Sequence, residues 1–396
     1  MKDILHFIPH TRFVVDSFVK SPDSVCNISA FFLTHWHYDH YRGLGPTFSY
    51  GPIYCSPTTA RLLETITCVD PQWLVPKQLN EPFIVDQVKV TFLDANHCPG
   101  SVMILFQTGH GNYLHTGDMR FAADWKYSKW KVLNEICLDT VYLDTTYCHK
   151  KFSFPSRETT IRHILDKIEQ NRHTQPSVHR HTLYVIATYG IGKERILDAL
   201  VQNGYRMYCG PDKYRIIQCL EYWDSQVMNE YFSTDPSESP IWVVGWNRIA
   251  ESVPGRLLPN FEVLEEWLHL ANNCRATKQR RLDHGTTNCS LPVLQQVVAL
   301  VPTGWTWRQK NNNNNNNQGE YFHSKANMYV YGIPYSEHSN YEELHRFIAW
   351  LKPQQVIPTV MSKGQPKHPF SHLLAETQVK KAFLQKWLSQ DPHTRG

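Results

Sequence analysis

The sequence predicts an α/β fold built from more than one domain. Short apolar segments alternate with segments whose apolar residues recur at helical spacing, the pattern of α/β proteins. A chain of 396 residues is long enough for two or three domains of about 150 residues each. A hydrophobic content of 41% with 19% charged residues is typical of folded protein rather than of disordered chain.

Charge and cysteine content narrow the class of protein. The formal net charge of +4 is compatible with a polyanionic partner but does not require one. We find no apolar run of about 18 residues and no secretory signal at the N-terminus, so we expect a soluble intracellular protein without membrane association. Ten cysteines without a CxxC pair indicate reduced thiols. The 21 histidines are the unusual feature, because histidine is the commonest metal-binding side chain.

The first part of the chain is rich in predicted strands. A helix is expected after Ser56, because serine is a favoured N-cap and Pro57 suits the first helical position. β-Branched and aromatic residues between turn signals predict the strands, at residues 28–34, 88–95, 102–108, 113–116 and 141–144.

Beyond Tyr147 strands alternate with helices. A helix is expected to begin at Ser156, and strand 183–188 leads into a helix that stops at Gly204. Further predicted elements are strands 241–244, 297–301, 328–332 and 356–360, a helix that ends at Pro353, and a closing helix over about 372–388. Two stretches are expected to be irregular: Arg275–Arg281, and the asparagine tract Asn311–Asn317, which receives no function.

The strongest functional signal is the sequence Thr34-His35-Trp36-His37-Tyr38-Asp39-His40 directly after an apolar strand. A strand end presents His35 and His37 on one side, and a tight turn brings Asp39 and His40 to the same place. Imidazole and carboxylate at this density favour Zn²⁺ or Mn²⁺, whereas a polar surface turn would not need four potential ligands in six residues. We therefore predict a metal site.

Other strand ends supply further donors. His97 follows the strand that ends Phe92-Leu93-Asp94, and Asp118 follows a strand through Leu114. Asp144 and His338 occupy similar positions later in the chain. Taken singly, each is typical of an ordinary polar loop residue, but their repetition at strand ends favours a shared site.

These motifs resemble the metallo-β-lactamase superfamily and, within it, the β-CASP nucleases. HxHxDH is the superfamily signature, and LDANHCPGSVMILF, HTGD, LDTTYC and YGIPYSEHS are similar to the DNA cross-link repair exonuclease branch that includes Artemis and Apollo. The resemblance runs from about Phe13 to Val360. It implies an αβ/βα metallo-β-lactamase sandwich with an inserted β-CASP α/β domain, divided into residues 1–147, 148–325 and a returning part, 326–396.

The resemblance also implies residue roles. A first metal site would use His35, His37, His97 and Asp118, and a second would use Asp39, His40, the bridging Asp118 and His338. Asp16 would position the HxHxDH loop, and Asp144 would hydrogen-bond a ligand histidine. The implied cofactor is Zn²⁺, as one or two ions, with Mn²⁺ or Mg²⁺ as options at the second site. Asp39, His40, Asp144 and His338 would be the catalytic residues.

The implied activity is a metal-dependent 5′→3′ DNA exonuclease of interstrand cross-link repair in the nucleus. Val360 matches a motif position where DNA-acting members have valine and RNA-processing members have histidine. We expect a preference for a 5′-phosphate, read by Ser336, Tyr147 and Lys193. For Lys193 the alternative is a solvated side chain in a structural turn. The rival functions are an RNA-processing nuclease and a small-molecule hydrolase of lactamase or glyoxalase type. A non-catalytic DNA-binding scaffold is disfavoured because every expected ligand is present.

Overall fold

The computed structural model describes residues 7–18, 27–174, 178, 181–253, 256–282, 291–304, 321–360 and 370. The chain divides into two compact units, which we call unit 1 (Met1–Lys150 with Glu337–Gly396) and unit 2 (Lys151–Ser336). Both combine helices with sheets, so the predicted α/β class is confirmed. Unit 2 is inserted into the sequence of unit 1, which therefore consists of two separate chain segments.

Unit 1 is built around two sheets. A parallel four-stranded sheet has the order β1-β2-β3-β4, and a mixed six-stranded sheet has the order β19-β9-β8-β7-β6-β5. The bounds of the first sheet are Phe13–Val15, Ala30–Phe32, Ile53–Cys55 and Leu74–Pro76 for β1 to β4. Those of the second are Phe83–Val85 (β5), Val88–Asp94 (β6), Val102–Thr108 (β7), Gly111–His115 (β8), Thr140–Leu143 (β9) and Gln355–Pro358 (β19).

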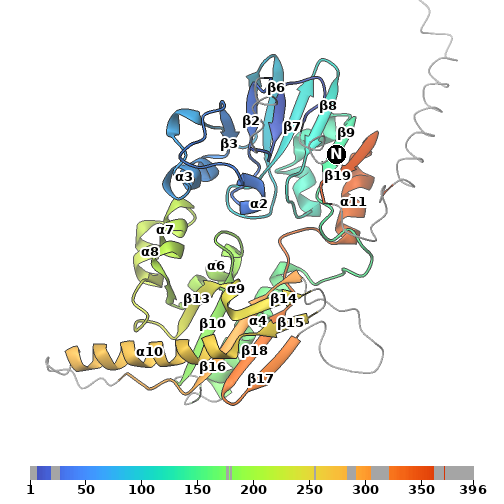
Figure 1. The fold of residues 1–396 in the computed structure, drawn as a ribbon. Helices are drawn as coiled ribbons and strands as arrows, with labels where there is room; N and C mark the ends of the chain where they lie inside the picture. Colours follow the sequence, from blue (N-terminus) through green and yellow to red (C-terminus); the bar gives the residue numbers. More distant parts are fainter. Residues whose placement is uncertain are drawn as a thin grey trace, which may run out of the picture. The chain divides into compact units, whose positions relative to one another are not determined.

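The two sheets pack face to face through aromatic side chains. The ring of Phe32 in β2 lies 6.5 Å from that of Phe92 in β6 and 5.0 Å from that of Phe106 in β7, both edge to face. Helix α3 (Pro57–Thr65) lies beside β3 and β4, away from the six-stranded sheet (Figure 1). Helix α11 (Tyr341–Leu351) packs Phe347 into the core on the other face of the six-stranded sheet. This helix–sheet–sheet–helix order is the expected αβ/βα sandwich.

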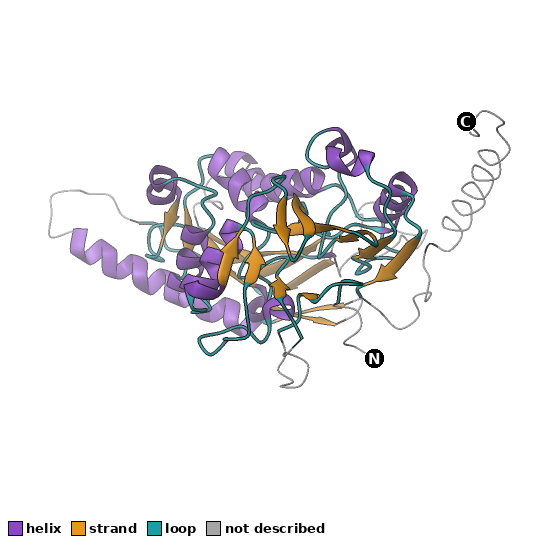
Figure 2. Cartoon of the chain, turned by 90° about the horizontal axis from the view of Figure 1, so that it is seen from above, coloured by secondary structure: helices purple, strands orange, loops and turns teal. Residues whose placement is uncertain are grey.

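Unit 2 has a seven-stranded sheet covered on both faces. Its order is β12-β11-β13-β10-β16-β18-β17, and every pair is parallel except β17 with β18. Helices α4 (Arg157–Thr174), α6 (Glu194–Gln202), α7 (Pro211–Cys219) and α8 (Ser225–Tyr231) cover one face; α9 (Trp246–Ile249) and the long α10 (Phe261–Leu282) cover the other (Figures 1 and 2). The strands are Thr182–Thr188 (β10), Met207–Cys209 (β11), Phe232–Ser233 (β12), Ile241–Gly245 (β13), Gln296–Pro302 (β16), Tyr321–Lys325 (β17) and Met328–Ile333 (β18), beside a hairpin of Ala250–Val253 (β14) and Arg256–Pro259 (β15).

Several local predictions are confirmed. The Ser56 hydroxyl accepts a hydrogen bond from Thr59 N at the start of α3, and Ser156 accepts one from Thr159 N at the start of α4. The predicted strands occur with ends shifted by a few residues, and β7 has the predicted bounds. Side chains at N-caps and apolar runs are local signals, which is why these elements were recognisable.

Other predictions differ from the structure. Arg275–Arg281 is not irregular, because it forms the last two turns of α10. Its arginine, alanine, lysine and glutamine residues are good helix formers, and Lys278 pairs with Glu238 at 3.2 Å. Strand β18, expected in the returning part, belongs to the sheet of unit 2. The asparagine tract and the closing helix at 372–388 lie outside the described residues. Among the helices that are described, none is both long and apolar enough to cross a membrane.

Candidate metal centre

The predicted ligands gather at one end of the unit 1 sandwich because each follows a strand. His35 and His37 come after β2, and His97 comes after β6. Asp118 follows β8, and Asp144 follows β9. Neighbouring strands bring their ends to the same edge, so short loops from both sheets place these side chains together. His338 arrives from the second segment of unit 1, just before α11.

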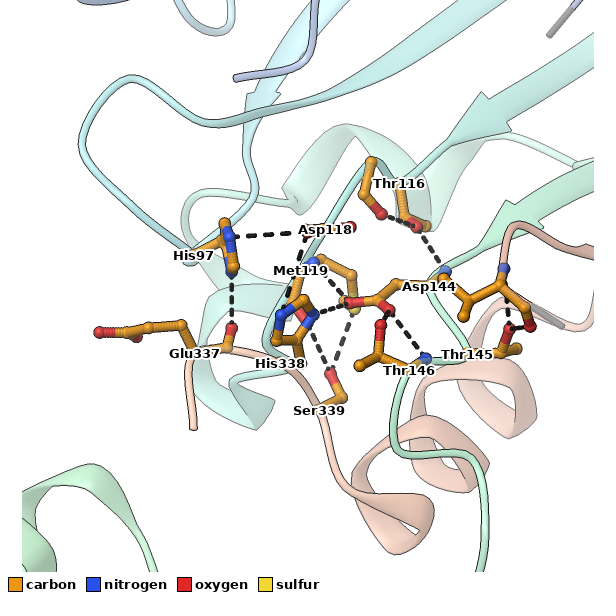
Figure 3. A network of polar contacts seen from close by, with 12 residues as sticks. His97, Thr116, Asp118, Met119, Asp144, Thr145, Thr146, Glu337, His338 and Ser339 are labelled. Carbon is orange, nitrogen blue, oxygen red and sulfur yellow. Dashed lines mark hydrogen bonds and ion pairs between the residues drawn. The ribbon is translucent and has the colours of Figure 1, made fainter. Parts of the chain in front are cut away.

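Asp118 is the centre of the cluster. Its Oδ2 atom lies 3.6 Å from Nε2 of His35, 3.4 Å from Nε2 of His40 and 3.7 Å from Nε2 of His97. Nε2 of His338 is 3.9 Å away (Figure 3). The carboxyl group is buried, with 10% of its side chain exposed. One carboxylate oxygen therefore faces four imidazole nitrogens, as a bridge between two metal sites requires.

Nδ1 of His37 lies close to Nε2 of both His35 and His97, so these three nitrogens form a group of their own within the cluster. The His37 Nδ1 atom lies 2.8 Å from Nε2 of His35 and 3.2 Å from Nε2 of His97. Tetrahedral Zn²⁺ with nitrogen ligands at about 2.0–2.1 Å spaces those ligands roughly 3.3–3.4 Å apart, so this group is close to the spacing a zinc ion needs. The cluster divides into three overlapping donor sets: His35, His37, His97 and Cys98; His35, His40 and Asp118; His97, Asp118 and His338.

Hydrogen bonds on the far side of each ring fix which nitrogen faces the centre. Thr34 Oγ1 gives its hydrogen to Asp16 Oδ2 at 2.7 Å, so it accepts from His35 Nδ1 at 3.0 Å. His97 Nδ1 donates to the Glu337 carbonyl at 3.1 Å, since a carbonyl only accepts. The Nε2 atoms of neutral His35 and His97 therefore carry lone pairs toward the cluster. His37 Nδ1 has at most one hydrogen to offer both of them, whereas a cation satisfies all three nitrogens.

Two buried carboxylates hold the remaining histidines. Asp16 Oδ2 lies 2.8 Å from Nδ1 of His40. Asp144 Oδ2 lies 2.8 Å from Nδ1 of His338 (Figure 3). Asp144 is itself fixed by hydrogen bonds from Met119 N, Thr146 N and Thr146 Oγ1. Carboxylate–histidine pairs of this kind orient the ring and strengthen the other nitrogen as a metal ligand. Asp16 and Asp144 thus each hold one histidine of the cluster through its Nδ1 atom.

The charges of the cluster follow from burial and from these pairs. Burial, together with the neighbouring His40 and His37, lowers the pKa of His35 well below its usual value. Burial and then His338 likewise lower the pKa of His97. Burial also opposes charge on His338, but Asp144 and Asp118 outweigh it and raise the pKa to about 9. The same balance, with Asp118 and Asp16, raises the pKa of His40, and His40 and His338 outweigh burial to lower that of Asp118.

The segment that carries His338 is fastened to the segment that follows Asp118. Ser339 N donates to Met119 O at 3.0 Å, and Phe121 N donates to Ser339 Oγ at 2.9 Å. Arg120, whose side chain is only 5% exposed, forms an ion pair of 3.1 Å with Glu343 in the first turn of α11. Glu343 also closes the capping box of that helix with Asn340. These contacts set the position of His338 relative to Asp118.

Two residues with positive φ, Asp16 and Gly117, support the metal centre. Asp16 has a φ of 52°, which few non-glycine residues adopt, and its carboxylate accepts from both N and Oγ1 of Thr34. Gly117 has the same φ of 52°, and a Cβ there would lie 2.7 Å from Cβ of Thr34. Only glycine fits at Gly117, because any side chain would displace the threonine that orients His35 and Asp16.

Two residues differ from the expected ligand set: Asp39 was expected as a ligand but faces solvent, and Cys98 was not expected but lies among the ligand atoms. The Asp39 side chain is 81% exposed, and its Oδ2 lies 3.8 Å from Nε2 of His40. It therefore sits at the solvent edge of the cluster rather than inside it. Cys98, which was not among the expected ligands, has its sulfur within 4.8 Å of the ligand atoms of His35, His37 and His97. Its position directly after His97 was the available signal.

The residues expected to read a 5′-phosphate are distributed over both units. In unit 1 the Tyr147 ring is buried, 5.8 Å from that of His338. Thr145, the residue after Asp144, donates from Oγ1 to the carbonyl of Val360 at 2.5 Å. In unit 2 Ser336 is buried, and the buried Lys193 donates from Nζ to Pro302 O at 2.6 Å with its ammonium over the Tyr189 ring. Lys193 is thus not the solvated side chain that we weighed as the alternative.

Part of this chain is similar to a described protein family. Residues 264–364 match the family described as DNA repair metallo-beta-lactamase. The human DNA cross-link repair 1A protein is 37% identical over 89% of this chain, which covers 30% of that protein. The stretch from 264 to 364 is thus similar to that family, and it includes His338. This similarity and the donor sets together imply that the chain binds divalent metal.

Two further relatives show how much of each protein this chain covers. The Arabidopsis thaliana protein named DNA ligase 6 is 36% identical over 95% of this chain. The Gallus gallus protein named 5′ exonuclease Apollo is 32% identical over 83% of it. The chain spans 25% of the first protein's length and 58% of the second's. Each relative is therefore considerably longer than the stretch that matches.

Replacing Gly117 is expected to damage metal binding. In Gly117→Ala the new Cβ collides with Thr34, so the hydrogen bonds that orient His35 and Asp16 are disturbed. We expect metal affinity, measured by competition with a chromophoric chelator, to fall at least about tenfold. Gly204→Ala is the control, because Gly204 also has a positive φ, of 74°, but has nothing within 4 Å of the new Cβ. Equal metal affinity in both variants would contradict this account of Gly117.

Metal binding is expected to release protons. His338 has a pKa of about 9 in the metal-free protein, so at pH 7 it must lose a proton before Nε2 can bind metal. His40, whose pKa is also raised, adds a second proton. We therefore expect release of about two protons at pH 7, and affinity that rises with pH until about pH 9. Calorimetric titration in buffers of different ionisation enthalpy measures this number, and His338→Gln should release one proton fewer.

The same pKa shift fixes the sign of a stability effect in the metal-free protein. Because the folded-state pKa of His338 is raised, its pairing with Asp144 contributes fully below the unfolded pKa of about 6.5. That contribution is lost as the pH rises through about 9. If the calorimetry of metal binding shows no proton release at pH 7, His338 and His40 are already neutral at that pH, which would contradict both the binding and the stability prediction.

Proposed function

We propose that this chain is a metal-dependent DNA nuclease that hydrolyses phosphodiester bonds in DNA interstrand cross-link repair. The observation that carries the proposal is the convergence of four histidine Nε2 atoms on Oδ2 of Asp118, with His37 beside them. The family described as DNA repair metallo-beta-lactamase and the relative named DNA cross-link repair 1A protein support DNA as the substrate. Repair of chromosomal DNA would place the protein in the nucleus.

The proposed cofactor is Zn²⁺ in a first site made by His35, His37, His97 and Asp118. A second site, for Zn²⁺, Mn²⁺ or Mg²⁺, would use His40, His338 and Asp118, with Asp39 at its solvent edge. Such metals, when bound, lower the pKa of a coordinated water and stabilise negative charge on phosphoryl oxygens. The predominance of imidazole among the donors favours zinc, because imidazole suits Zn²⁺ better than it suits Mg²⁺.

The protein groups around the cluster have separate tasks in this proposal. Asp16 and Asp144 hold His40 and His338 in fixed orientations through their Nδ1 atoms. Asp39 is the carboxylate that reaches solvent, so it is the group placed to orient an attacking water or to take its proton. No serine or cysteine nucleophile is needed, because water attacks the phosphorus directly.

We also propose that the nuclease begins at a 5′ end. The relative named 5′ exonuclease Apollo supports this direction. A terminal phosphate monoester carries more charge than an internal diester, so polar and cationic groups can select it. The proposed groups are Tyr147, Ser336 and Lys193. Valine at position 360, where RNA-processing members have histidine, favours DNA over the rival RNA substrate.

Neutralising Asp39 tests the proposed chemistry. In Asp39→Asn the volume is almost unchanged, while the charge and the proton acceptor at the solvent edge are lost. We expect a folded protein, by circular dichroism and thermal melting, whose rate on end-labelled single-stranded DNA falls by about 100-fold or more. Asp124→Asn, which alters an exposed carboxylate of the turn Ala123–Tyr127, is the control and should cut normally. Near-normal turnover by Asp39→Asn would contradict the proposed role.

Substrate pairs test the proposed direction and sugar preference. Oligonucleotides that differ only in a 5′-phosphate or 5′-hydroxyl, and matched DNA and RNA strands, are compared by initial rates with wild-type protein. We expect faster digestion of the 5′-phosphorylated strand, by roughly tenfold or more since one charge-assisted hydrogen bond is worth about 1.5–3 kcal/mol, and faster digestion of DNA. Degradation from the 3′ end, or faster cutting of RNA, would overturn this part of the proposal.

A further inference from the structure

Three aromatic rings form an anchored stack on the HxHxDH loop. The indole of Trp36 is 7% exposed and donates from Nε1 to Thr67 Oγ1 at 2.8 Å. The Tyr41 ring stacks on it, with centroids 5.2 Å apart and planes 15° apart. The Tyr38 ring meets Tyr41 edge to face at 5.7 Å and 89°. The ring of Tyr38 thus packs on Tyr41, Tyr41 stacks on Trp36, and Trp36 is fixed by its hydrogen bond to Thr67.

Tyr38 is exposed where a core residue would be buried. It is 67% exposed, and the helical turn α2 (Tyr38–Tyr41) contains no buried residue. Tyr38 therefore contributes little to the core of unit 1, although tyrosine is large enough to bury considerable area. A single exposed aromatic ring is ordinary on a protein surface, so it is the place of Tyr38 in the chain that points to a contact with another molecule.

The position of Tyr38 points to the kind of molecule. Its chain neighbours are His37, which belongs to the three-nitrogen group, and Asp39, which lies at the solvent edge of the cluster. Consecutive Cα atoms are about 3.8 Å apart, so the backbone of Tyr38 lies next to the metal centre and its exposed ring starts from there. Among the large apolar side chains that are exposed in the described residues, Tyr38 is the one flanked on both sides by candidate ligands.

We propose that Tyr38 is the stacking surface for the unpaired nucleobase next to the phosphodiester that is cut. This inference rests on the proposed nuclease function and adds a base-binding residue to it. A base attached to a phosphate at the metal centre projects away from the metals, and an exposed ring beside them offers it an apolar face. Stacking on tyrosine does not distinguish the four bases, so the contact would position any terminal nucleotide.

The size of the effect follows from stacking energies in proteins that bind single strands. One base stacked on an aromatic side chain is worth about 1–3 kcal/mol, which corresponds to a factor of roughly 5 to 150 in affinity. Losing the Tyr38 ring should therefore raise the KM for single-stranded DNA or weaken binding by such a factor. The metal content of the protein should not change, because Tyr38 is not one of the proposed metal ligands.

The test uses three variants of the full chain. Tyr38→Ala removes the ring, and Tyr38→Phe keeps the ring but removes the hydroxyl. Tyr127→Ala is the matched control, because Tyr127 is an 82% exposed tyrosine of the same unit in the turn Ala123–Tyr127. Each is combined with Asp39→Asn to prevent cutting, loaded with Zn²⁺, and titrated with single-stranded DNA that carries 2-aminopurine as its 5′-terminal base. Stacking on tyrosine quenches the fluorescence of this base.

The expected result is that Tyr38→Ala binds about 5- to 150-fold more weakly and loses the quenching, while Tyr38→Phe and Tyr127→Ala retain both. An abasic 5′-terminal nucleotide should weaken binding to the parent protein by a similar factor and should not weaken Tyr38→Ala further. If Tyr38→Phe behaves like Tyr38→Ala, the hydroxyl rather than the ring makes the contact, and the stacking proposal is wrong.

Failure of this inference can be told apart from failure of the proposed function. If wild-type protein loaded with Zn²⁺ cuts neither DNA nor RNA, the nuclease proposal fails whatever Tyr38 does. If wild-type protein cuts DNA while Tyr38→Ala binds and quenches normally, the nuclease proposal stands and the stacking role is overturned. Equal zinc content in all variants, measured by atomic absorption, confirms that a change in binding does not come from loss of metal.

Discussion

The structure of unit 1 depends on the convergence of imidazole nitrogens on one buried carboxylate. Asp118 presents Oδ2 to four Nε2 atoms at 3.4–3.9 Å, and each of those rings is hydrogen-bonded through its Nδ1 atom on the other side. Lone pairs facing one another in a buried space are unfavourable unless protons or cations lie between them. The surrounding fold must therefore resist the tendency of these side chains to turn away from one another.

That resistance comes from backbone and carboxylates rather than from the ligands themselves. Asp16 and Thr34 brace His35 and His40, and Asp144 braces His338. Gly117 allows the close approach that this bracing needs, and Asp16 adopts a positive φ to make it. A positive φ costs the non-glycine Asp16 of order 1–3 kcal/mol, whereas Gly117 adopts it freely, so the rest of the fold has to offset the strain at Asp16 alone.

The sequence allowed much of the site to be predicted because its signals are local. His35, His37, His40, His97, Asp118 and His338 each lie next to a recognisable apolar strand or helix, and the structure brings all six together. Asp39 lay within the same motif, but its side chain faces solvent. The direction of a side chain at the end of a turn depends on backbone angles that residue spacing does not determine.

The features that the sequence did not reveal depend on contacts between distant residues. Helix α10 is a separate case: its last turns carry a run of basic residues that we expected to be irregular, although these residue types favour helix. The fastening of Ser339 to Met119 and Phe121, and of Glu343 to Arg120, joins positions far apart in the chain. Trp36 and Tyr41 are five residues apart, a spacing that does not indicate stacking on a regular helix.

The division of unit 1 into two chain segments has a consequence for its biosynthesis. A ribosome completes residues up to Lys150, with five of the imidazole and carboxylate donors, and then makes all of unit 2 before it reaches His338 and helix α11. During that interval the outer face of β6, β7 and β8 lacks Phe347 and Ile348, which cover it in the finished protein. The nascent chain therefore exposes an apolar sheet face while a second domain emerges, and such exposed surface is prone to aggregation until the last segment covers it.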